Sequence, residues 1–324
     1  MTESNNTGSD NSAGYADSGA DIGVTIAGVR FRNPVIAASG TFGFGSEYSG
    51  LIDVSQLGGI CTKGLTFTPR QGNKGMRLWE TASGLLNSIG LENSGVPFFI
   101  ENELPKMKQL GPVIIANISG EMAQDYISGA VLLNNSPVDM VELNISCPNV
   151  KAGGMAFGLD PGTAAALVAA VRRVCSKKPL IVKLSPNAPS LTSVALACVK
   201  AGADALSLVN TIKAMAIDTE KRKPVFENIS AGLSGPAIKP IALRMVWELY
   251  GSIKNMDSNV PIIGIGGIST VQDALEFLMA GAAAIQVGTA TFAHPAAMTD
   301  IIGGIRQYVK TNNMKSVSQI SIRE

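Results

Sequence analysis

Polar residues gather at the ends of apolar, strand-like segments of this sequence. Two of them are lysines inside apolar runs, Lys63 and Lys183. A lysine in such a place needs a counter-charge or a polar ligand nearby. Any one polar residue could merely mark where a strand leaves the core, but the set predicts a shared site. Its members are Ser39, Lys63, Asn117, Asn144, Cys147, Lys183, Asn210, Thr211, Gly266, Gly267, Gly288 and Thr289.

Cys147 differs from the other cysteines. Free cysteine is usually a small buried hydrophobe, and we expect that role for the remaining three. These are Cys61, Cys175 and Cys198. Cys147 is followed at once by Pro148, which ends the strand, and then by the glycine-rich stretch 151–158, which could close over a site. A thiol whose thiolate fraction is raised locally can accept a proton from a substrate.

Two glycine motifs, GIGGI (264–268) and QVGTA (286–290), end the last two strand-like runs. Glycine lets the backbone approach a ligand closely, and a following helix offers free N–H groups to a phosphate. Either motif alone could be an ordinary tight turn. Because barrels often bind phosphate after their last two strands, we favour a phosphate site.

Asparagines are frequent near these ends, whereas carboxylates are scarce. The asparagines are Asn87, Asn117, Asn144, Asn149 and Asn210. Amides both donate and accept hydrogen bonds, so they suit a flat polar ring that alternates carbonyl and N–H groups. Asn149 could equally be a loop residue. Glu142 lies inside a strand and is expected to be structural, and the single histidine, His294, gives little material for a zinc site or a Ser-His-Asp triad.

Eight short apolar runs provide the elements that must position these residues. They span 34–40, 59–64, 113–120, 140–147, 180–186, 205–211, 261–267 and 284–290. Most are followed by helix-like segments, for which Asp160 before Pro161 predicts an N-cap and Ser269 with Gln272 a capping box. This alternation favours a (β/α)8 TIM barrel over a doubly wound open sheet. In a barrel the strand ends converge on one mouth.

The long gaps between strands predict insertions over the C-terminal face of the barrel. They run from about 65 to 112 and from about 212 to 260. Residues 24–31 are expected to form a hairpin that closes the bottom. Residues 1–21 are polar and predicted to be a disordered tail, and residues 22–324 are predicted to form a single barrel domain.

The composition narrows the class of protein. Of 324 residues, 46% are hydrophobic, and the formal net charge is +1, so a large core is expected and a nucleic-acid partner is not. We expect no membrane span and no signal peptide, because no long apolar run is present. The cysteines form no CxxC pair, which favours reduced thiols and a cytoplasmic location.

The motifs in their order resemble the dihydroorotate dehydrogenase family of flavin enzymes, in particular the catalytic subunits of class 1B. The resemblance covers about 22 to 310. It is carried by ASGTFGFGSEY (38–48), TKGLT (62–66), PRQGN (69–73), ETASGLLNSIGLEN (80–93), ANISG (116–120), ELNISCPNVKAGGMAFG (142–158), VKLSPN (182–187), LVNT (208–211), AGLSGPAIKP (231–240, with Ala231 where the family has glycine), IIGIGGI (262–268) and VGTA (287–290).

This resemblance implies one FMN at the mouth of a (β/α)8 barrel. The implied FMN contacts are Ser39, Lys63, Gly64, Asn117, Asn144, Lys183, Val209, Gly235, Gly266, Gly267, Gly288 and Thr289. The last four would hold the phosphate, and Lys183 would lie near the N1–O2 edge of the ring, where a cation stabilises the reduced form. The implied orotate contacts are Lys63, Asn87, Ser88, Ile89, Gly90, Leu91, Asn144, Asn149, Asn210 and Thr211.

The resemblance further implies a reaction and a partner. Cys147 would take the C5 proton of (S)-dihydroorotate while C6 passes a hydride to N5 of FMN, a step of UMP biosynthesis. Electrons would reach NAD through a second subunit that carries FAD and a 2Fe-2S cluster, with two copies of this chain in a heterotetramer. A class 1A enzyme that uses fumarate is the nearest alternative. A flavin barrel for uracil-like rings, a phosphate-binding lyase or isomerase without flavin, and a barrel that only binds a ligand are the others.

Overall fold

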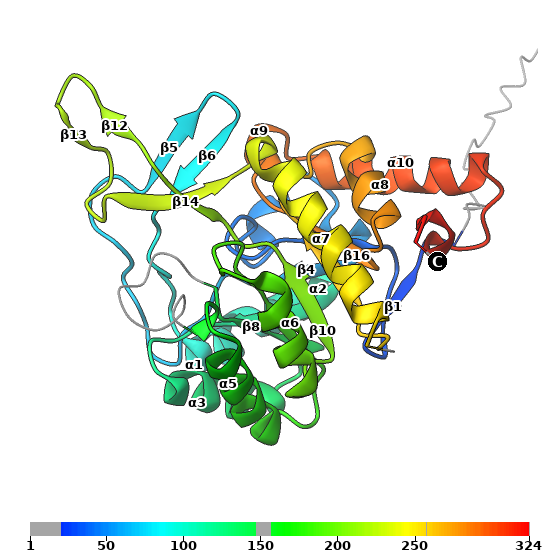
Figure 1. The fold of residues 1–324 in the computed structure, drawn as a ribbon, viewed down its shortest axis with the longest axis horizontal. Helices are drawn as coiled ribbons and strands as arrows, with labels where there is room; N and C mark the ends of the chain where they lie inside the picture. Colours follow the sequence, from blue (N-terminus) through cyan, green and yellow to red (C-terminus); the bar gives the residue numbers. More distant parts are fainter. Residues whose placement is uncertain (1–20, 147–156, 257, 324) are drawn as a thin grey trace, which may run out of the picture.

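The computed structural model describes residues 21–146, 157–256 and 258–323. At its centre eight parallel strands form a closed barrel, drawn in Figure 1. In barrel order they are β3 (Val35–Ala37), β4 (Gly59–Cys61), β7 (Val113–Ile118), β8 (Met140–Asn144), β9 (Leu180–Lys183), β10 (Ala205–Leu208), β15 (Ile262–Ile265) and β16 (Ala284–Val287). Each predicted run contains one of them, so the predicted TIM barrel is confirmed. The predicted tail, apart from Asp21, lies outside the described residues.

Helices surround the barrel and cover the outer faces of the strands (Figure 1). They are α2 (Leu104–Leu110), α3 (Ala123–Asn134), α5 (Pro161–Val174), α6 (Leu191–Lys200), α7 (Lys239–Lys254), α8 (Val271–Met279) and α10 (Ala297–Thr311). Shorter helical turns are η1 (Ser46–Tyr48), η2 (Val54–Gln56), α1 (Val96–Phe98), η3 (Phe99–Glu103), η4 (Pro236–Ile238), α9 (Ala290–Ala293) and η5 (Val317–Ile320). The crossover from β3 to β4, all of which is described, has only η1 and η2 in place of an α-helix.

The helix starts test two sequence predictions. Asp160 caps α5 as predicted, because its carboxylate accepts a 2.7 Å hydrogen bond from the backbone N–H of Thr163. The predicted capping box of α8 was wrong by one residue. Thr270 is the N-cap, and Asp273 accepts from the Thr270 backbone N–H in return.

The barrel interior is layered because alternate residues of a strand point to the same side. The lower layer is an apolar cluster that includes Ile36, Cys61, Ile115, Met140, Ile181, Ala205, Ile263 and Ala284. Two residues further along five of these strands lie polar side chains, which we call the polar layer. Its members are Asn117, Glu142, Lys183, Ser207 and Gln286, all of them buried. The core is therefore apolar at the N-terminal end of the barrel and polar toward its mouth.

A hairpin closes the apolar end, as predicted. Its strands are β1 (Val24–Ile26) and β2 (Val29–Phe31), paired antiparallel. Ile26 and Phe31 are fully buried and belong to the same cluster as the lower layer. The hairpin therefore seals the barrel on the side opposite the polar layer.

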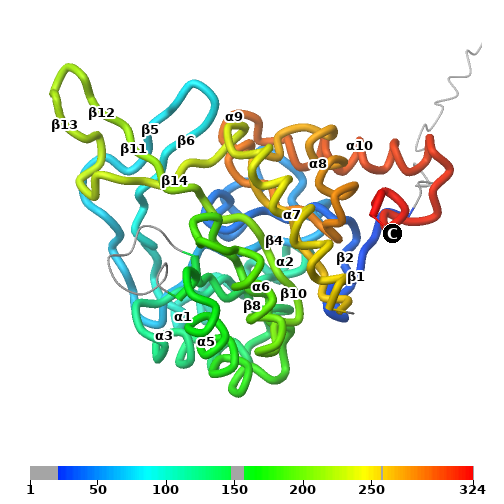
Figure 2. The backbone as a smooth tube through the Cα atoms, viewed as in Figure 1, coloured from blue at the N-terminus to red at the C-terminus, as the bar shows by residue number. Residues whose placement is uncertain are grey.

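The two insertions combine into one antiparallel sheet at the mouth. The first contributes β5 (Leu78–Thr81) and β6 (Gly84–Asn87), and the second contributes β11 (Ile212–Met215) and β14 (Ser230–Ser234). The second also carries a small hairpin of β12 (Ile217–Asp218) and β13 (Lys223–Pro224). Figure 2 shows these strands together at the upper left, beyond the ring of helices. Pairing of β14 with β6 joins the two insertions into one wall.

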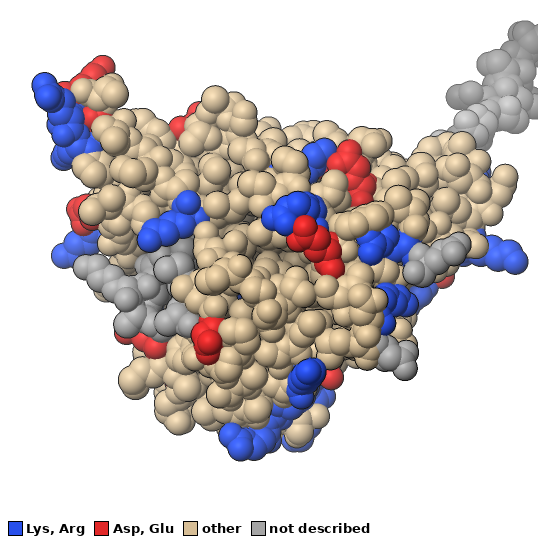
Figure 3. All heavy atoms as spheres, in the orientation of Figure 1, with Lys and Arg blue, Asp and Glu red and all other residues tan. Residues whose placement is uncertain are grey.

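The surface carries charges of both signs. In Figure 3, Lys and Arg side chains are interspersed with Asp and Glu over the face shown, in keeping with the formal net charge of +1. None of the described helices combines the length and the apolarity that a membrane crossing requires.

Candidate functional site

A cavity of about 370 Å³ opens at the C-terminal ends of the barrel strands. Asn144 and Lys183, the last residues of β8 and β9, line it together with Asn87 from the insertion sheet. The predicted site residues that line it are Ser39, Lys63, Gly64, Asn87, Ile89, Gly90, Leu91, Asn144, Lys183, Val209, Asn210, Thr211, Gly235, Gly266, Gly267, Gly288 and Thr289. The barrel thus brings together positions spread over some 250 residues of sequence.

Four predicted site residues are not among those lining this cavity. Asn117 is fully buried in the polar layer. Ser88 is buried beside Asn73, whose amide donates a 3.0 Å hydrogen bond to its hydroxyl. Cys147 and Asn149 lie outside the described residues.

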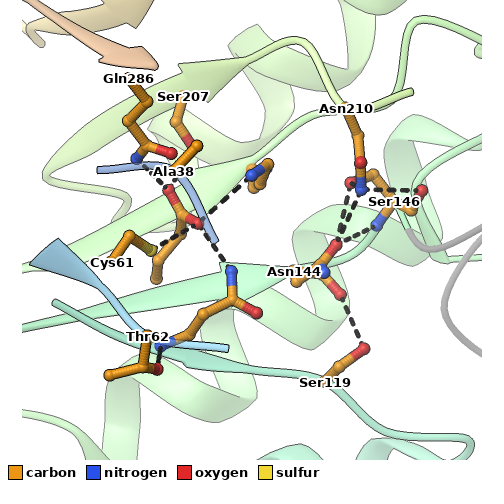
Figure 4. Close-up of polar contacts among 12 residues, drawn as sticks. Ala38, Cys61, Thr62, Ser119, Asn144, Ser146, Ser207, Asn210 and Gln286 are labelled. Atoms are coloured by element: carbon orange, nitrogen blue, oxygen red, sulfur yellow. Dashed lines mark hydrogen bonds and ion pairs between the residues drawn. The ribbon is translucent and has the colours of Figure 1, made fainter. Parts of the chain in front are cut away.

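A buried carboxylate, Glu142, organises the floor of the site. Its Oε1 accepts hydrogen bonds from Asn117 Nδ2 at 2.6 Å and from Cys61 Sγ at 3.2 Å. Its Oε2 accepts from Ser207 Oγ at 2.8 Å and from Gln286 Nε2 at 2.9 Å, the contacts drawn in Figure 4. These donors come from four strands around the barrel, so Glu142 ties its inner wall together.

Lys183 supplies the counter-charge that the sequence demanded. Its Nζ lies 3.7 Å from Glu142 Oε1, and its side chain is 6% exposed. Burial alone would raise the pKa of Glu142, but the Lys183 ammonium and the hydrogen bonds from Ser207, Gln286 and Cys61 hold it below its usual value. Burial, and then the Glu142 charge, raise the pKa of the Cys61 thiol well above its usual value. The floor therefore contains a carboxylate, a nearby ammonium group and a protonated thiol.

Two buried acceptors in the floor have no hydrogen-bond partner within the described structure. They are Oδ1 of Asn117 and Oε1 of Gln286. Both amides direct their NH2 groups at Glu142, which as a carboxylate can only accept. A methyl group on Gly64 would lie 3.2 Å from Asn117 Oδ1, and both Gly64 and Gln286 line the cavity. Since buried polar atoms are normally paired, these oxygens indicate a ligand that donates hydrogen bonds.

Asn144, Ser146 and Asn210 form a second polar cluster on the cavity wall. Asn144 Oδ1 accepts from the Ser146 hydroxyl at 2.9 Å and from Asn210 Nδ2 at 3.4 Å. Figure 4 shows the three side chains converging from β8, the segment after it, and the segment after β10. The oxygen of Asn144 is thus engaged within the chain, which leaves its NH2 group as the donor for a ligand.

Glycines shape the opposite wall, where the loops after β14 and β15 meet. Gly267 has a φ of +72°, and a Cβ there would lie 2.8 Å from the carbonyl oxygen of Gly235. Gly266, at a φ of +129°, packs against Ala242 of α7 in the same way. Only glycine combines this backbone conformation with so close a packing. The side-chain hydroxyl of Thr289 closes this wall by donating to Ser234 Oγ at 2.8 Å.

Several residues of the site escaped sequence reasoning. Gln286 lines the cavity from inside β16, and Glu142 sits beneath it. The signal for both was a polar residue inside an otherwise apolar strand, the same signal that drew attention to Lys183. At the mouth, Arg77 and Glu92 also line the cavity and form a 2.7 Å ion pair. They lie within the first insertion, where the sequence offered no strand pattern to place them.

Comparison with known proteins agrees with this geometry. The family model described as dihydroorotate dehydrogenase matches residues 22–309, which include every strand of the barrel. Proteins named dihydroorotate dehydrogenase B (NAD(+)), catalytic subunit, from Petrotoga mobilis and Caldicellulosiruptor bescii are 55% and 51% identical over 300 residues, or 93% of this chain and 98% of each relative. One of the same name from Bacteroides thetaiotaomicron is 47% identical over 302 residues, with the same coverage. The chain belongs to the dihydroorotate dehydrogenase family.

Proposed function

We propose that this chain oxidises (S)-dihydroorotate to orotate in UMP biosynthesis, with FMN bound in the cavity. One observation carries the proposal: in a member of this family, lysines, asparagine amides and glycine loops from distant segments line a single cavity at the barrel mouth. Residues 22–324 would form the FMN-binding domain. The spread of the cysteines, of which Cys61, Cys175 and Cys198 are free, fits a reduced, cytoplasmic protein.

The residues present fit a flavin mononucleotide. The ring offers an N–H donor for the buried acceptors of the floor, and Lys183 offers a cation for the charge that reduction adds. The glycine loops can admit a phosphate close to the backbone. The residues that would hold FMN are Ser39, Lys63, Gly64, Asn117, Asn144, Lys183, Val209, Gly235, Gly266, Gly267, Gly288 and Thr289.

The substrate would bind through amides and one cation. Lys63 would pair with the orotate carboxylate, and the NH2 group of Asn144 would donate to a ring carbonyl. The remaining contacts would be Asn87, Asn149, Asn210 and Thr211, with backbone groups of Ser88, Ile89, Gly90 and Leu91. These groups fix the ring by hydrogen bonds at several edges, which is how an enzyme holds reacting atoms in place.

Cys147 would be the base. Its thiolate would take the proton from C5 of dihydroorotate, which leaves the thiol protonated and the C5–C6 bond ready to become double. FMN, when bound, supplies the acceptor for the hydride that leaves C6. Lys183 and the amide donors would offset negative charge as it develops.

NAD would be the final electron acceptor, reached through a second subunit. The relatives named above carry NAD(+) and "catalytic subunit" in their names. The four cysteines of this chain are far apart in sequence, so we place FAD and the 2Fe-2S cluster on the partner. The proposed assembly is a homodimer of this chain with two such partners.

The visible spectrum of the purified chain, followed by anaerobic addition of dihydroorotate, tests the proposal. Flavin bands that bleach on addition are expected. Bands that persist would move the substrate elsewhere, and a colourless protein that cannot be loaded with FMN would contradict the proposal altogether. Oxidation of the bleached chain by fumarate without any partner would identify a fumarate-using enzyme instead.

A further inference from the structure

The mechanism above leaves Glu142 without a role, although it is the most highly connected group in the barrel. Within the described residues it accepts four side-chain hydrogen bonds and pairs with Lys183. Its partners come from β4, β7, β9, β10 and β16. It is completely buried, one layer above an apolar cluster.

Stability alone gives no reason for a carboxylate at this position. Desolvating a charged group costs several kcal/mol, and replacing a buried ion pair by apolar residues of similar volume is often neutral or stabilising. The lower layer shows that this barrel packs apolar side chains two residues away on the same strands. The charge of Glu142 therefore calls for a reason outside the packing of the core.

The reason lies in what Glu142 imposes on the cavity. A carboxylate only accepts hydrogen bonds, so Asn117 and Gln286 must turn their NH2 groups toward it and their oxygens away. It also balances the charge of Lys183, which lines the cavity 3.7 Å from it. One buried anion thus fixes two acceptors and makes the net charge of the floor close to zero.

We propose that Glu142 is a positioning residue that sets the reduction potential of the bound flavin. This inference rests on the proposed FMN site. Reduction adds negative charge to the ring, and a nearby buried anion opposes that charge while a lone cation would favour it. Glu142 therefore lowers the midpoint potential relative to a floor that held Lys183 alone. A lower potential helps the chain to pass electrons onward instead of retaining them.

The test compares two substitutions at position 142 in the full chain loaded with FMN. Glu142→Gln keeps the size and removes the charge, whereas Glu142→Asp keeps the charge and disturbs the hydrogen-bond lengths. The midpoint potential is measured by equilibration with redox dyes. For Glu142→Gln, the ratio of affinities for reduced and oxidised FMN is expected to rise at least tenfold, a positive shift of about 30 mV for a two-electron couple. Glu142→Asp is expected to stay within about threefold of the unmodified chain.

Three results would overturn the inference. One is an unchanged or lowered potential in Glu142→Gln. Another is an equal shift in Glu142→Asp, because that would assign the effect to geometry and not to charge. The third is an unmodified chain that cannot bind FMN, which would end the proposed function as well. A chain that binds and bleaches FMN but shows either of the first two results loses only this inference.

Ser207→Ala keeps the inference testable if Glu142→Gln does not fold. Ser207 is fully buried, does not line the cavity, and donates 2.8 Å to Glu142 Oε2. Without that donor the carboxylate charge is less dispersed, so the potential is expected to fall, in the direction opposite to Glu142→Gln. A potential that rises or does not move would contradict the role of the carboxylate.

Discussion

The side-chain amide of Asn210, just beyond β10, donates a 2.8 Å hydrogen bond to the hydroxyl of Ser146, the residue that precedes Cys147 in the chain. The same amide lies 3.4 Å from Asn144 Oδ1, and Ser146 donates to that oxygen as well. A residue that lines the cavity therefore also holds the backbone that leads to the proposed base. Substrate binding and placement of the base are coupled through one amide.

Asn210→Ala should impair both substrate binding and turnover. Loss of a hydrogen bond that leaves its partners unpaired costs about 1–3 kcal/mol, which corresponds to a KM for dihydroorotate about 10 to 100 times higher. We also expect a lower kcat, because Ser146 loses its anchor. Steady-state kinetics with an artificial electron acceptor measure both constants, and FMN content should stay unchanged.

Ser146→Ala separates the two effects. It removes the internal hydrogen bond but no proposed substrate contact, so kcat should fall while KM changes little. Asn102→Ala is the matched control, because Asn102 is exposed and its amide donates only to the local carbonyl of Phe98. Equal effects of Ser146→Ala and Asn210→Ala on KM would show that the amide acts only by positioning.

Cys147→Ala should retain FMN but lose reduction by dihydroorotate at neutral pH. Removal of a general base typically costs about 10²- to 10⁴-fold in rate. Stopped-flow loss of the visible flavin absorbance under anaerobic conditions measures the step directly. Near-normal reduction in this variant would remove Cys147 as the base.

Cys198→Ala is the control for the loss of a thiol. Cys198 is fully buried in α6, and burial raises its pKa to about 12, so it stays protonated at neutral pH. This variant should be reduced at the normal rate. A comparable loss in both variants would point to a general effect on folding.

The barrel could be predicted because its signal is local. Each strand is a continuous apolar run, since a parallel strand inside a ring of helices is buried on both faces. The polar residue that ends a run, such as Lys183 in β9, marks the mouth without any knowledge of pairing. Even the helix start at Asp160 followed from neighbouring residues, whereas at α8 two overlapping Ser/Thr patterns competed and Thr270 won.

The wall above the mouth could not be predicted because its contacts are remote. Leu86 of β6 pairs with Leu233 of β14, and neither segment has a partner nearby in sequence that would announce a sheet. Glu142 posed a different difficulty. In a strand covered on both sides, periodicity does not tell which face a residue uses, and only the barrel register places Glu142 beside Asn117.

Gly267→Ala should weaken both folding and FMN binding. An L-residue at a φ of +72° costs about 1–2 kcal/mol, and the new Cβ would lie 2.8 Å from backbone atoms of Gly235 and Lys239. We expect a loss of at least about 2 kcal/mol in the free energy of unfolding. Urea denaturation of the apo chain measures it, and FMN titration measures the distortion of the proposed phosphate loop.

Gly303→Ala is the matched control. Gly303 lies exposed in α10, and a Cβ there meets no atom within 4 Å. Alanine in a helix should stabilise the chain by about 0.5–1 kcal/mol and leave FMN binding unchanged. Equal losses of FMN affinity in both variants would contradict a specific role for the Gly267 loop.

Asp273 gives the chain a pH-dependent contribution to stability. Burial alone would raise the pKa of Asp273, but the hydrogen bond from Lys239 and those from the backbone N–H groups of Ser269 and Thr270 lower it. Lys239 Nζ lies 2.7 Å from the carboxylate, whose side chain is 14% exposed. A lowered folded pKa stabilises the protein above the unfolded value of about 3.9, and this stabilisation is lost as pH falls through the folded pKa.

Asp273→Asn should therefore cost about 1 kcal/mol at neutral pH, a typical value for a helix cap with a partly buried ion pair. Urea unfolding at a series of pH values should show a constant difference from the unmodified chain between about pH 7 and 5, narrowing below about pH 4. Glu80→Gln, at an exposed position of β5, should show no such dependence. A difference that persists unchanged into acid would mean that Asp273 acts through its shape as a cap, because the asparagine would then lack only the geometry and not the charge.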